Sequence, residues 1–169
     1  MSALSDQMEA LVVRTRSSDG NIQGRLHHGG RVEFGFRSQE DYERYDADGL
    51  ARQLGALLRA MHQDRASALR AVRAEAGRTP TEANRPHWDA GRRRYDAEVA
   101  QVAAKGVSRH RLVAVRAVGM RDHEVSVRPG ALDQLDAAGF AAEFQSAYRA
   151  FRTDHRSRLN LLKRKHFPR

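Results

Sequence analysis

An internal repeat limits the folds open to this chain more than any single motif does. Residues 46–69 align with residues 136–159, and nine of the 24 aligned positions are identical. Alanine and arginine identities carry little weight in a chain rich in both. The Asp, Gly and Leu identities carry more, and the apolar spacing is kept where residues differ. The repeat predicts two copies of one structural unit, arranged like a homodimer fused into one polypeptide.

Length and composition narrow the class of protein. A chain of 169 residues with 40% hydrophobic content can form one core, or two small halves that share one, but not two independent enzyme domains. The absence of cysteine excludes disulfides, thiolate nucleophiles and Cys-ligated zinc. The first ten residues hold two acids and no basic side chain, unlike a signal peptide. No apolar run approaches the ~20 residues of a membrane span. We therefore expect a cytoplasmic protein.

Alternating apolar and polar residues near the N-terminus predict an antiparallel meander. Residues 10–16 are rich in β-formers and run into a Ser-Ser-Asp-Gly turn, after which residues 21–27 follow. In residues 31–37, Val32, Phe34 and Phe36 alternate with other residues. This pattern is typical of three strands with one buried face.

A long helix is predicted after the meander. Asp46 can cap it by accepting backbone N–H groups of the first turn, and Gly77 ends it. A helix over residues 47–76 is about 45 Å long at 1.5 Å per residue. Its apolar side chains recur at helical spacing, at Leu50, Leu54, Leu57, Leu58, Met61, Ala68, Leu69 and Val72.

The second half repeats this order after a linker. The proline-containing residues 77–86 separate a first unit, residues 1–76, from a second unit, residues 87–169. We expect the second unit to open with a helix over residues 88–104, broken by Gly106.

The second unit is then expected to have lost or shortened one strand. Strands are predicted over residues 111–118 and 123–128, before a long helix over residues 137–165. This helix carries the aromatic residues Phe140, Phe144, Tyr148 and Phe151. We expect these rings to face the aliphatic side chains of the first long helix near a pseudo-twofold axis.

A short leading helix, a meander with glycine turns and a long helix that opens with Asp-Ala-x-Gly-Leu or Asp-Ala-x-Gly-Phe together resemble the YbaB/EbfC family of nucleoid-associated proteins. The likeness covers residues 9–72 and, less completely, 88–162. It implies an α+β fold in which two α-β-β-β-α units of one chain form a pseudo-dimer. It also implies DNA binding without known catalytic residues.

A related likeness is to YbaB-like accessory proteins encoded beside actinobacterial type VII (ESX) secretion systems. That likeness implies a protein-interaction or chaperone role with a protein partner in place of DNA. The sequence leaves the choice open, together with further homodimerisation.

Basic residues are concentrated at the C-terminus. The net charge is +9, and residues 149–169 supply +7 of it, although arginine outnumbers lysine 27 to 3, as in proteins of GC-rich genomes. Cations at this density can contact phosphates of double-stranded DNA without reading bases. Alternatively they complement the helix dipole, or meet acidic protein or anionic lipid surfaces. The predicted DNA-binding residues are Arg149, Arg152, Arg156, Arg158, Lys163, Arg164, Lys165 and Arg169.

A second basic patch is predicted at Arg92, Arg93 and Arg94. Trp88 and Tyr95 flank it, and an aromatic ring beside arginines can stack on bases or form cation–π pairs. The alternative is the solvated face of an amphipathic helix whose aromatic residues lie in the core, and this interpretation is the commoner one for such a run.

The remaining residue patterns do not predict catalysis. His27 and His28 are adjacent and point to opposite faces of a strand, and the other histidines lack metal-binding spacing. Acids in residues 40–48 suit the positive end of the following helix. The glycines do not form a phosphate-binding loop before a helix, and no nucleophile motif is present. We expect no catalytic residues, no cofactor and no metal site.

Overall fold

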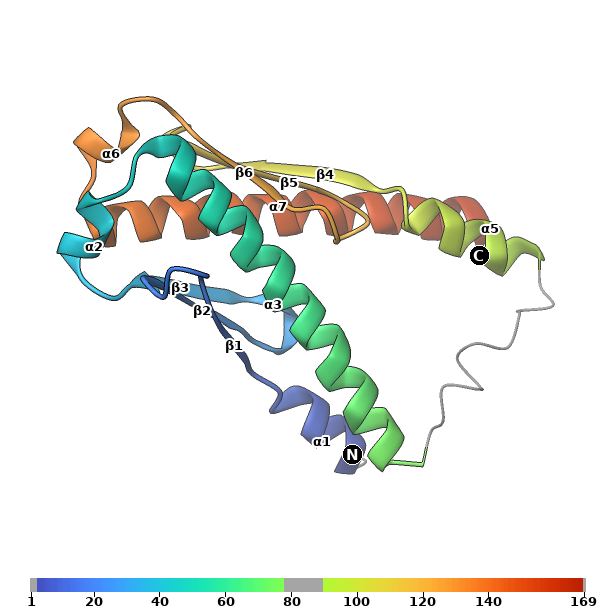
Figure 1. Ribbon diagram of the computed structural model, residues 1–169. Coiled ribbons are helices and arrows are strands. Elements are labelled where there is room, and N and C mark those ends of the chain that lie inside the picture. The colour runs from blue at the N-terminus through green and yellow to red at the C-terminus, as the bar shows by residue number, and fades with distance from the viewer. Residues whose placement is uncertain (1–2, 78–89, 169) are drawn as a thin grey trace.

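The protein has an α+β fold in which an α-β-β-β-α order occurs twice (Figure 1). It is seen in a computed structural model that describes residues 3–77 and 90–168. The first unit comprises α1 (Ala3–Glu9), β1 (Val13–Arg16), β2 (Ile22–Leu26), β3 (Val32–Phe36), the short α2 (Gln39–Glu43) and α3 (Ala47–Glu75). The second comprises α5 (Ala90–Val99), β4 (Ala103–Val107), β5 (Val113–Val118), β6 (Glu124–Val127), the short α6 (Ala131–Gln134) and α7 (Ala137–His166). The predicted fold class and both long helices are confirmed.

The second meander is complete, which corrects the prediction that it had lost or shortened one strand. Its three strands pair antiparallel in the order β4-β5-β6, as β1-β2-β3 do in the first unit. The strand that was not predicted is β4, whose first two residues, Ala103 and Ala104, fall within the helix predicted over residues 88–104. That helix ends at Val99, and Gly106 lies within β4.

The strand was not predicted because it is rich in alanine, and alanine has a high intrinsic helix propensity. Tertiary packing overrides that propensity here. In the structure Ala104 and Gly106 face inward and are buried, while Lys105 points outward. Most of the predicted linker, residues 78–86, and Trp88 lie outside the described residues.

Two pairs of identical aspartates in the repeat make corresponding contacts in both units. Asp46 caps α3 by accepting the N–H of Gly49 at 2.5 Å, and Asp136 caps α7 through Gly139 at 2.7 Å. Further along each helix, an aspartate reaches the first strand of its own sheet. Asp64 accepts the Thr15 hydroxyl at 3.1 Å, and Asp154 accepts the Lys105 backbone N–H at 2.9 Å. The repeat therefore preserves the cap and the contact between helix and first strand.

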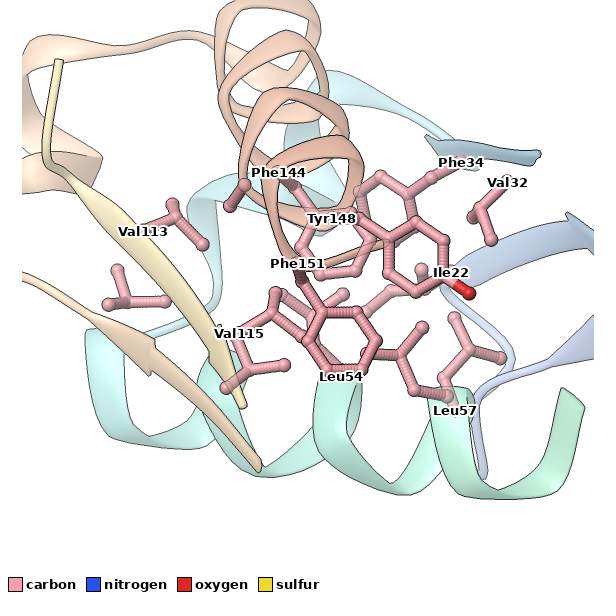
Figure 2. Close-up of a cluster of buried hydrophobic side chains, with 14 of the residues drawn as sticks. Ile22, Val32, Phe34, Leu54, Leu57, Val113, Val115, Phe144, Tyr148 and Phe151 are labelled. Carbon is pink, nitrogen blue, oxygen red and sulfur yellow. The ribbon is translucent and has the colours of Figure 1, made fainter. Parts of the chain in front are cut away.

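Both units share one hydrophobic core (Figure 2). α7 packs on β4 and β5 of its own sheet and on β3 of the other unit, while α3 packs on β1, β2 and β6. The rings of α7 mainly meet the first sheet and its following helix, since Phe144 lies 4.8 Å from Phe34 and Phe140 lies 5.9 Å from Tyr42, measured between ring centroids. The expected packing of the two long helices on each other is thus largely replaced by packing on sheets.

The C-terminal halves of both long helices leave the core. The last buried residue of α3 is Met61, and that of α7 is Phe151. Beyond these points α1 packs beside α3 and α5 beside α7, and the two helix ends lie well apart (Figure 1). Half of the predicted basic helix is therefore outside the shared core.

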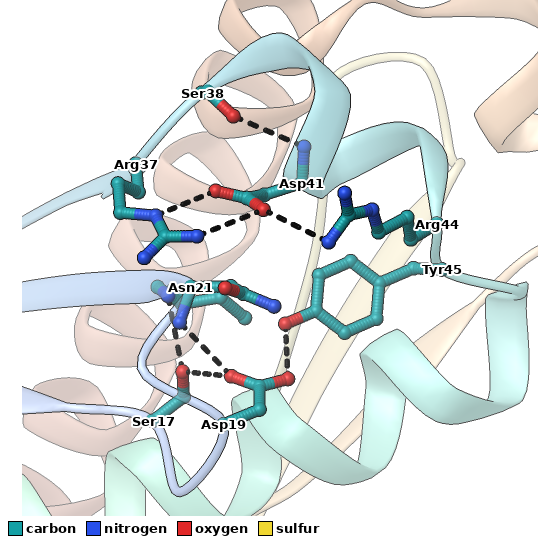
Figure 3. Close-up of polar contacts among 9 residues, drawn as sticks. Ser17, Asp19, Asn21, Arg37, Ser38, Asp41, Arg44 and Tyr45 are labelled. Atoms are coloured by element: carbon teal, nitrogen blue, oxygen red, sulfur yellow. Dashed lines mark hydrogen bonds and ion pairs between the residues drawn. The ribbon is translucent and has the colours of Figure 1, made fainter.

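One buried carboxylate, that of Asp41, fixes the corner between β3 and α3 (Figure 3). Asp41 is 3% exposed and accepts from Arg37 at 2.8 Å, with Arg44 at 3.7 Å and its own N–H bonded to Ser38. The hydrogen bond from Arg37 holds the pKa of Asp41 below its usual value. This network orients α2, whose buried Tyr42 donates to the Leu135 carbonyl of the second unit at 2.9 Å.

A strained turn in the second unit leads to a stability prediction. Gly20 and Arg111 occupy equivalent turn positions, because their N–H groups donate to the carbonyls of the buried Ser17 and Ser108. Their φ angles are +76° and +59°, which favour glycine. Arg111→Gly is expected to raise the free energy of unfolding by about 1 kcal/mol, and Gly20→Ala to lower it by about 1 kcal/mol or more. Urea denaturation of both variants tests this, and a destabilised Arg111→Gly protein would contradict it.

Candidate nucleic-acid interface

The predicted DNA-binding residues of α7 do not form one continuous patch. Arg169 lies outside the described residues, and the other seven divide into three groups according to what surrounds them. Each group follows from the position of its residues along α7, because the middle of the helix lies beside the β2–β3 connection and β4, and its end lies against α5.

The first group has its charge compensated by acids. Arg158 pairs with Asp154 at 3.0 Å, one helical turn away, and Lys165 pairs with Glu98 of α5 at 2.8 Å. The hydrogen bond from Lys165 holds the pKa of Glu98 below its usual value. Arg158 and Lys165 therefore stabilise the fold locally, and phosphates would have to compete with these acids.

The second group faces the first unit. Arg149, Arg152 and Arg156 line a hollow of about 570 Å³ together with residues 29–33, which connect β2 to β3 and begin β3. Arg152 donates to the Gly29 carbonyl at 2.7 Å. Arg149 and Arg156 are exposed. The sequence did not indicate this arrangement, since its two sides are more than 100 residues apart.

The third group joins α7 to the second predicted patch. Lys163 and Arg164 line a groove of about 930 Å³ with Arg92 and Tyr95 of α5 and with Phe167. Here the structure brings together the two basic patches that the sequence predicted separately.

Tyr95 does not offer an open stacking face in this groove. It is 8% exposed and contacts the rings of His166 and Phe167 at 5.8 and 5.4 Å, while the Arg92 guanidinium lies 5.6 Å from its ring. Arg93 and Arg94 are exposed on α5. Tyr95 is therefore buried against the end of α7 and is not part of the shared hydrophobic core, while Trp88 lies outside the described residues.

Sequence reasoning missed a set of arginines on the first sheet. Arg14, Arg16 and Arg25 point away from the core, and Arg14 pairs with Arg25 across neighbouring strands. Like charges directly opposite each other are unfavourable without a counterion. The alternation of inward apolar and outward basic residues could have identified this face.

A buried histidine, His123, and a partly buried one, His62, pack together at the contact between the units. His62 of α3 stacks on His123 at 4.4 Å and hydrogen-bonds the Tyr148 hydroxyl at 3.0 Å. Burial lowers the pKa of His62 to about 3 and that of His123 to about 4. Both are neutral at pH 7. Within residues 3–77 and 90–168 no group of three or more histidines and acids could hold a metal ion.

Two further observations bear on function. Within the part of the chain that the structure describes, every helix is too short or too polar to cross a membrane. Comparisons with protein-family models, curated proteins and solved structures found no match to this chain. Function is therefore argued from the arrangement of charges.

Proposed function

We propose that this protein is a non-enzymatic, nucleoid-associated protein of the cytoplasm that binds double-stranded DNA with little sequence specificity. The observation that carries the proposal is a set of cations on α7 without acidic partners. Among the described residues, Arg149, Arg156, Lys163 and Arg164 have no carboxylate within ion-pair distance. Free cations concentrated on one helix favour a polyanionic partner.

The mechanism is contact with the phosphate backbone. Each cation that neutralises a phosphate releases a condensed counterion, so affinity falls as salt rises. Four such contacts correspond to a slope of log K against log salt of roughly −3.6. No side chain is proposed to read base edges, because the free groups are arginine and lysine on an exposed helix and not a set of Asn or Gln placed for a groove.

The resemblance to YbaB/EbfC proteins supports the proposal. Two α-β-β-β-α units in one chain offer the same elements as a homodimer of that family. Fold alone does not carry function, so the charge distribution remains the main argument.

A second candidate is a protein-interaction module or chaperone of a type VII secretion system. The observation that favours it is an apolar groove of about 700 Å³ between α5 and α7, lined by Val102, Leu161 and Leu162. Leu161 is 65% exposed, and an exposed leucine in a groove is typical of helix-in-groove binding. The neighbouring genes would separate the two candidates.

DNA binding is tested by fluorescence anisotropy of a mixed-sequence duplex at several salt concentrations. The parent protein should bind with a steep salt dependence. Lys163→Glu combined with Arg164→Glu should weaken binding by about tenfold or more at 50 mM salt, because two phosphate contacts become repulsive. Lys165 is left intact, since its reversal would break the contact with Glu98.

The matched control is Lys105→Glu combined with Arg121→Glu, which changes the net charge equally on exposed positions of the second sheet. This control should retain most of the affinity. If the parent does not bind DNA at low salt, the proposal is wrong. If both variants lose affinity equally, binding depends on net charge and not on the cations of α7.

A further inference from the structure

The hollow between the two units is the strongest additional feature of the molecule. We call it the seam hollow. It lies between the β2–β3 connection of the first unit and α7 of the second, and its volume is about 570 Å³. Its lining residues are Gly29, Gly30, Arg31, Val32, Glu33, Gln145, Tyr148, Arg149, Arg152, Thr153 and Arg156.

The seam hollow is strongly positive. It contains four arginines and a single carboxylate, Glu33. That carboxylate is already engaged by Arg31 at 3.1 Å and by His27 at 3.2 Å. The remaining three arginines, at positions 149, 152 and 156, share one face of α7 because they are three and four residues apart. Their charge is therefore not neutralised by Glu33.

The internal repeat supplies a comparison for the environment of these arginines. Arg152 is equivalent to His62, ninety residues earlier, and His62 closes its side of the interface by stacking on His123. Arg59, the equivalent of Arg149, donates to the His123 carbonyl at 2.6 Å. On that side both side chains contact the second unit, whereas Arg149 and Arg156 are exposed on the α7 side.

A second hollow includes Arg59, the repeat equivalent of Arg149, and its positive and negative charges are balanced. It includes Arg52 and Arg59, but also Asp48 and Glu124, and its volume is about 650 Å³. Two units with the same fold thus differ in one respect, which is an excess of arginine at the seam hollow. Arginine is in excess in only one of two hollows that the same fold forms. This excess indicates that the arginines bind a ligand and are not needed to form the fold.

The turn at Gly29 and Gly30, between β2 and β3, leaves room for the Arg152 side chain. Gly30 has φ +85°, and a Cβ there would lie 2.2 Å from the Arg152 guanidinium carbon. Arg152 is held against the turn by its bond to the Gly29 carbonyl. The planar guanidinium is suited to bidentate recognition of phosphate oxygens, and Arg149 and Arg156 flank it.

We infer that the seam hollow is a binding site for phosphate groups, built jointly by the two units. A free polyphosphate and the backbone of DNA present the same chemistry to it. The inference concerns the site itself and does not depend on the ligand being DNA.

Calorimetric titration of the full chain with inorganic tripolyphosphate at low salt tests the site. The parent protein should bind, and Arg149→Gln combined with Arg156→Gln should lose at least about tenfold in affinity, because two charge-assisted contacts disappear. Both side chains are exposed, so the melting temperature should stay at the parent value. The matched control, Lys105→Gln combined with Arg121→Gln, removes the same charge at exposed positions outside the hollow to which no phosphate contact is assigned, and it should bind tripolyphosphate almost as the parent does.

A competition experiment with a DNA duplex distinguishes the phosphates of DNA from a free phosphate compound. If tripolyphosphate displaces a DNA duplex from the parent, and the Arg149 and Arg156 variant loses both ligands, then the backbone of DNA occupies the hollow. If that variant still binds DNA, the ligand is a free phosphate compound. No tripolyphosphate binding by the parent, or equal losses in both variants, overturns the inference whatever the result with DNA.

Discussion

Acidification from pH 7 to pH 5 is expected to lower the free energy of unfolding by about 4 kcal/mol. The cause is the stacked pair at the contact between the units, where burial lowers the pKa of His62 to about 3 and that of His123 to about 4. His123 is fully buried, and its Nε2 atom has no hydrogen-bond partner among the described residues. A proton on His123 Nε2 would therefore lack a partner, and a charge on either ring would lie close to the other ring.

The direction of the effect follows from proton linkage. The unfolded chain protonates both histidines below their ordinary pKa of 6.5, whereas the folded chain does so only near pH 4 and pH 3. Stability is therefore full above pH 6.5 and falls as the pH decreases. A pH of 5 is about 1.5 units below the unfolded pKa of each histidine. At about 1.36 kcal/mol per unit, the two histidines together lower the free energy of unfolding by about 4 kcal/mol.

Burial also lowers the pKa of His155, which therefore adds to the loss of stability in the same interval, whereas carboxylates act at lower pH. Hydrogen bonds and nearby cations lower the pKa values of several carboxylates, among them Asp41 and Asp154. Their contribution to stability is present above the unfolded values near 4 and is lost as the pH falls through the folded values. The interval from pH 7 to pH 5 therefore reports mainly on the histidines.

Urea denaturation at pH 7, 6 and 5 measures this dependence. His62→Gln keeps a group that can bond Tyr148 but removes one titrating ring, so its stability should depend less steeply on pH. His28→Gln, which changes an exposed histidine, is the matched control and should follow the parent. A parent protein equally stable at pH 5 and pH 7 would show that the stacked pair is not buried in solution.

Gly106→Ala is expected to destabilise the protein by about 3 kcal/mol or more. A Cβ at this position of β4 would lie 2.0 Å from the backbone N of Phe151 and 2.3 Å from the carbonyl O of Ala147. Both atoms belong to the backbone of α7, so a rotamer change cannot relieve the contact and the helix itself must shift. Such a shift also disturbs the core that Phe151 shares with the first unit.

The matched control is Gly35→Ala in β3. A Cβ there has no atom within 4 Å, and alanine costs less conformational entropy than glycine. Gly35→Ala should therefore leave stability unchanged or raise it by about 0.5 kcal/mol. Thermal unfolding followed by circular dichroism compares the two variants. Similar melting temperatures for both would mean that α7 does not lie against β4 as closely as described.

Local patterns predicted most of the elements. The repeated Asp-Ala-x-Gly segment located both helix caps, because a cap depends on residues only three positions apart. Apolar side chains at every second position, Val32, Phe34 and Phe36, predicted β3, because this pattern also depends only on residues close together in the sequence. The failure at β4 is equally local, since Ala103, Ala104 and Gly106 lack the bulky alternating side chains that indicate a strand.

The duplication, the order of the elements other than β4 and the concentration of charge at the C-terminus can all be read from the amino-acid sequence. Which of those charges are free depends on how the chain folds. Lys165 is paired by an acid 67 positions away, Arg152 is bonded to a turn 123 positions away, and the unpaired Arg149 meets Arg31 in one hollow. The physical reason is that charge compensation depends on distances in space, and the packing of both units around one core sets these distances.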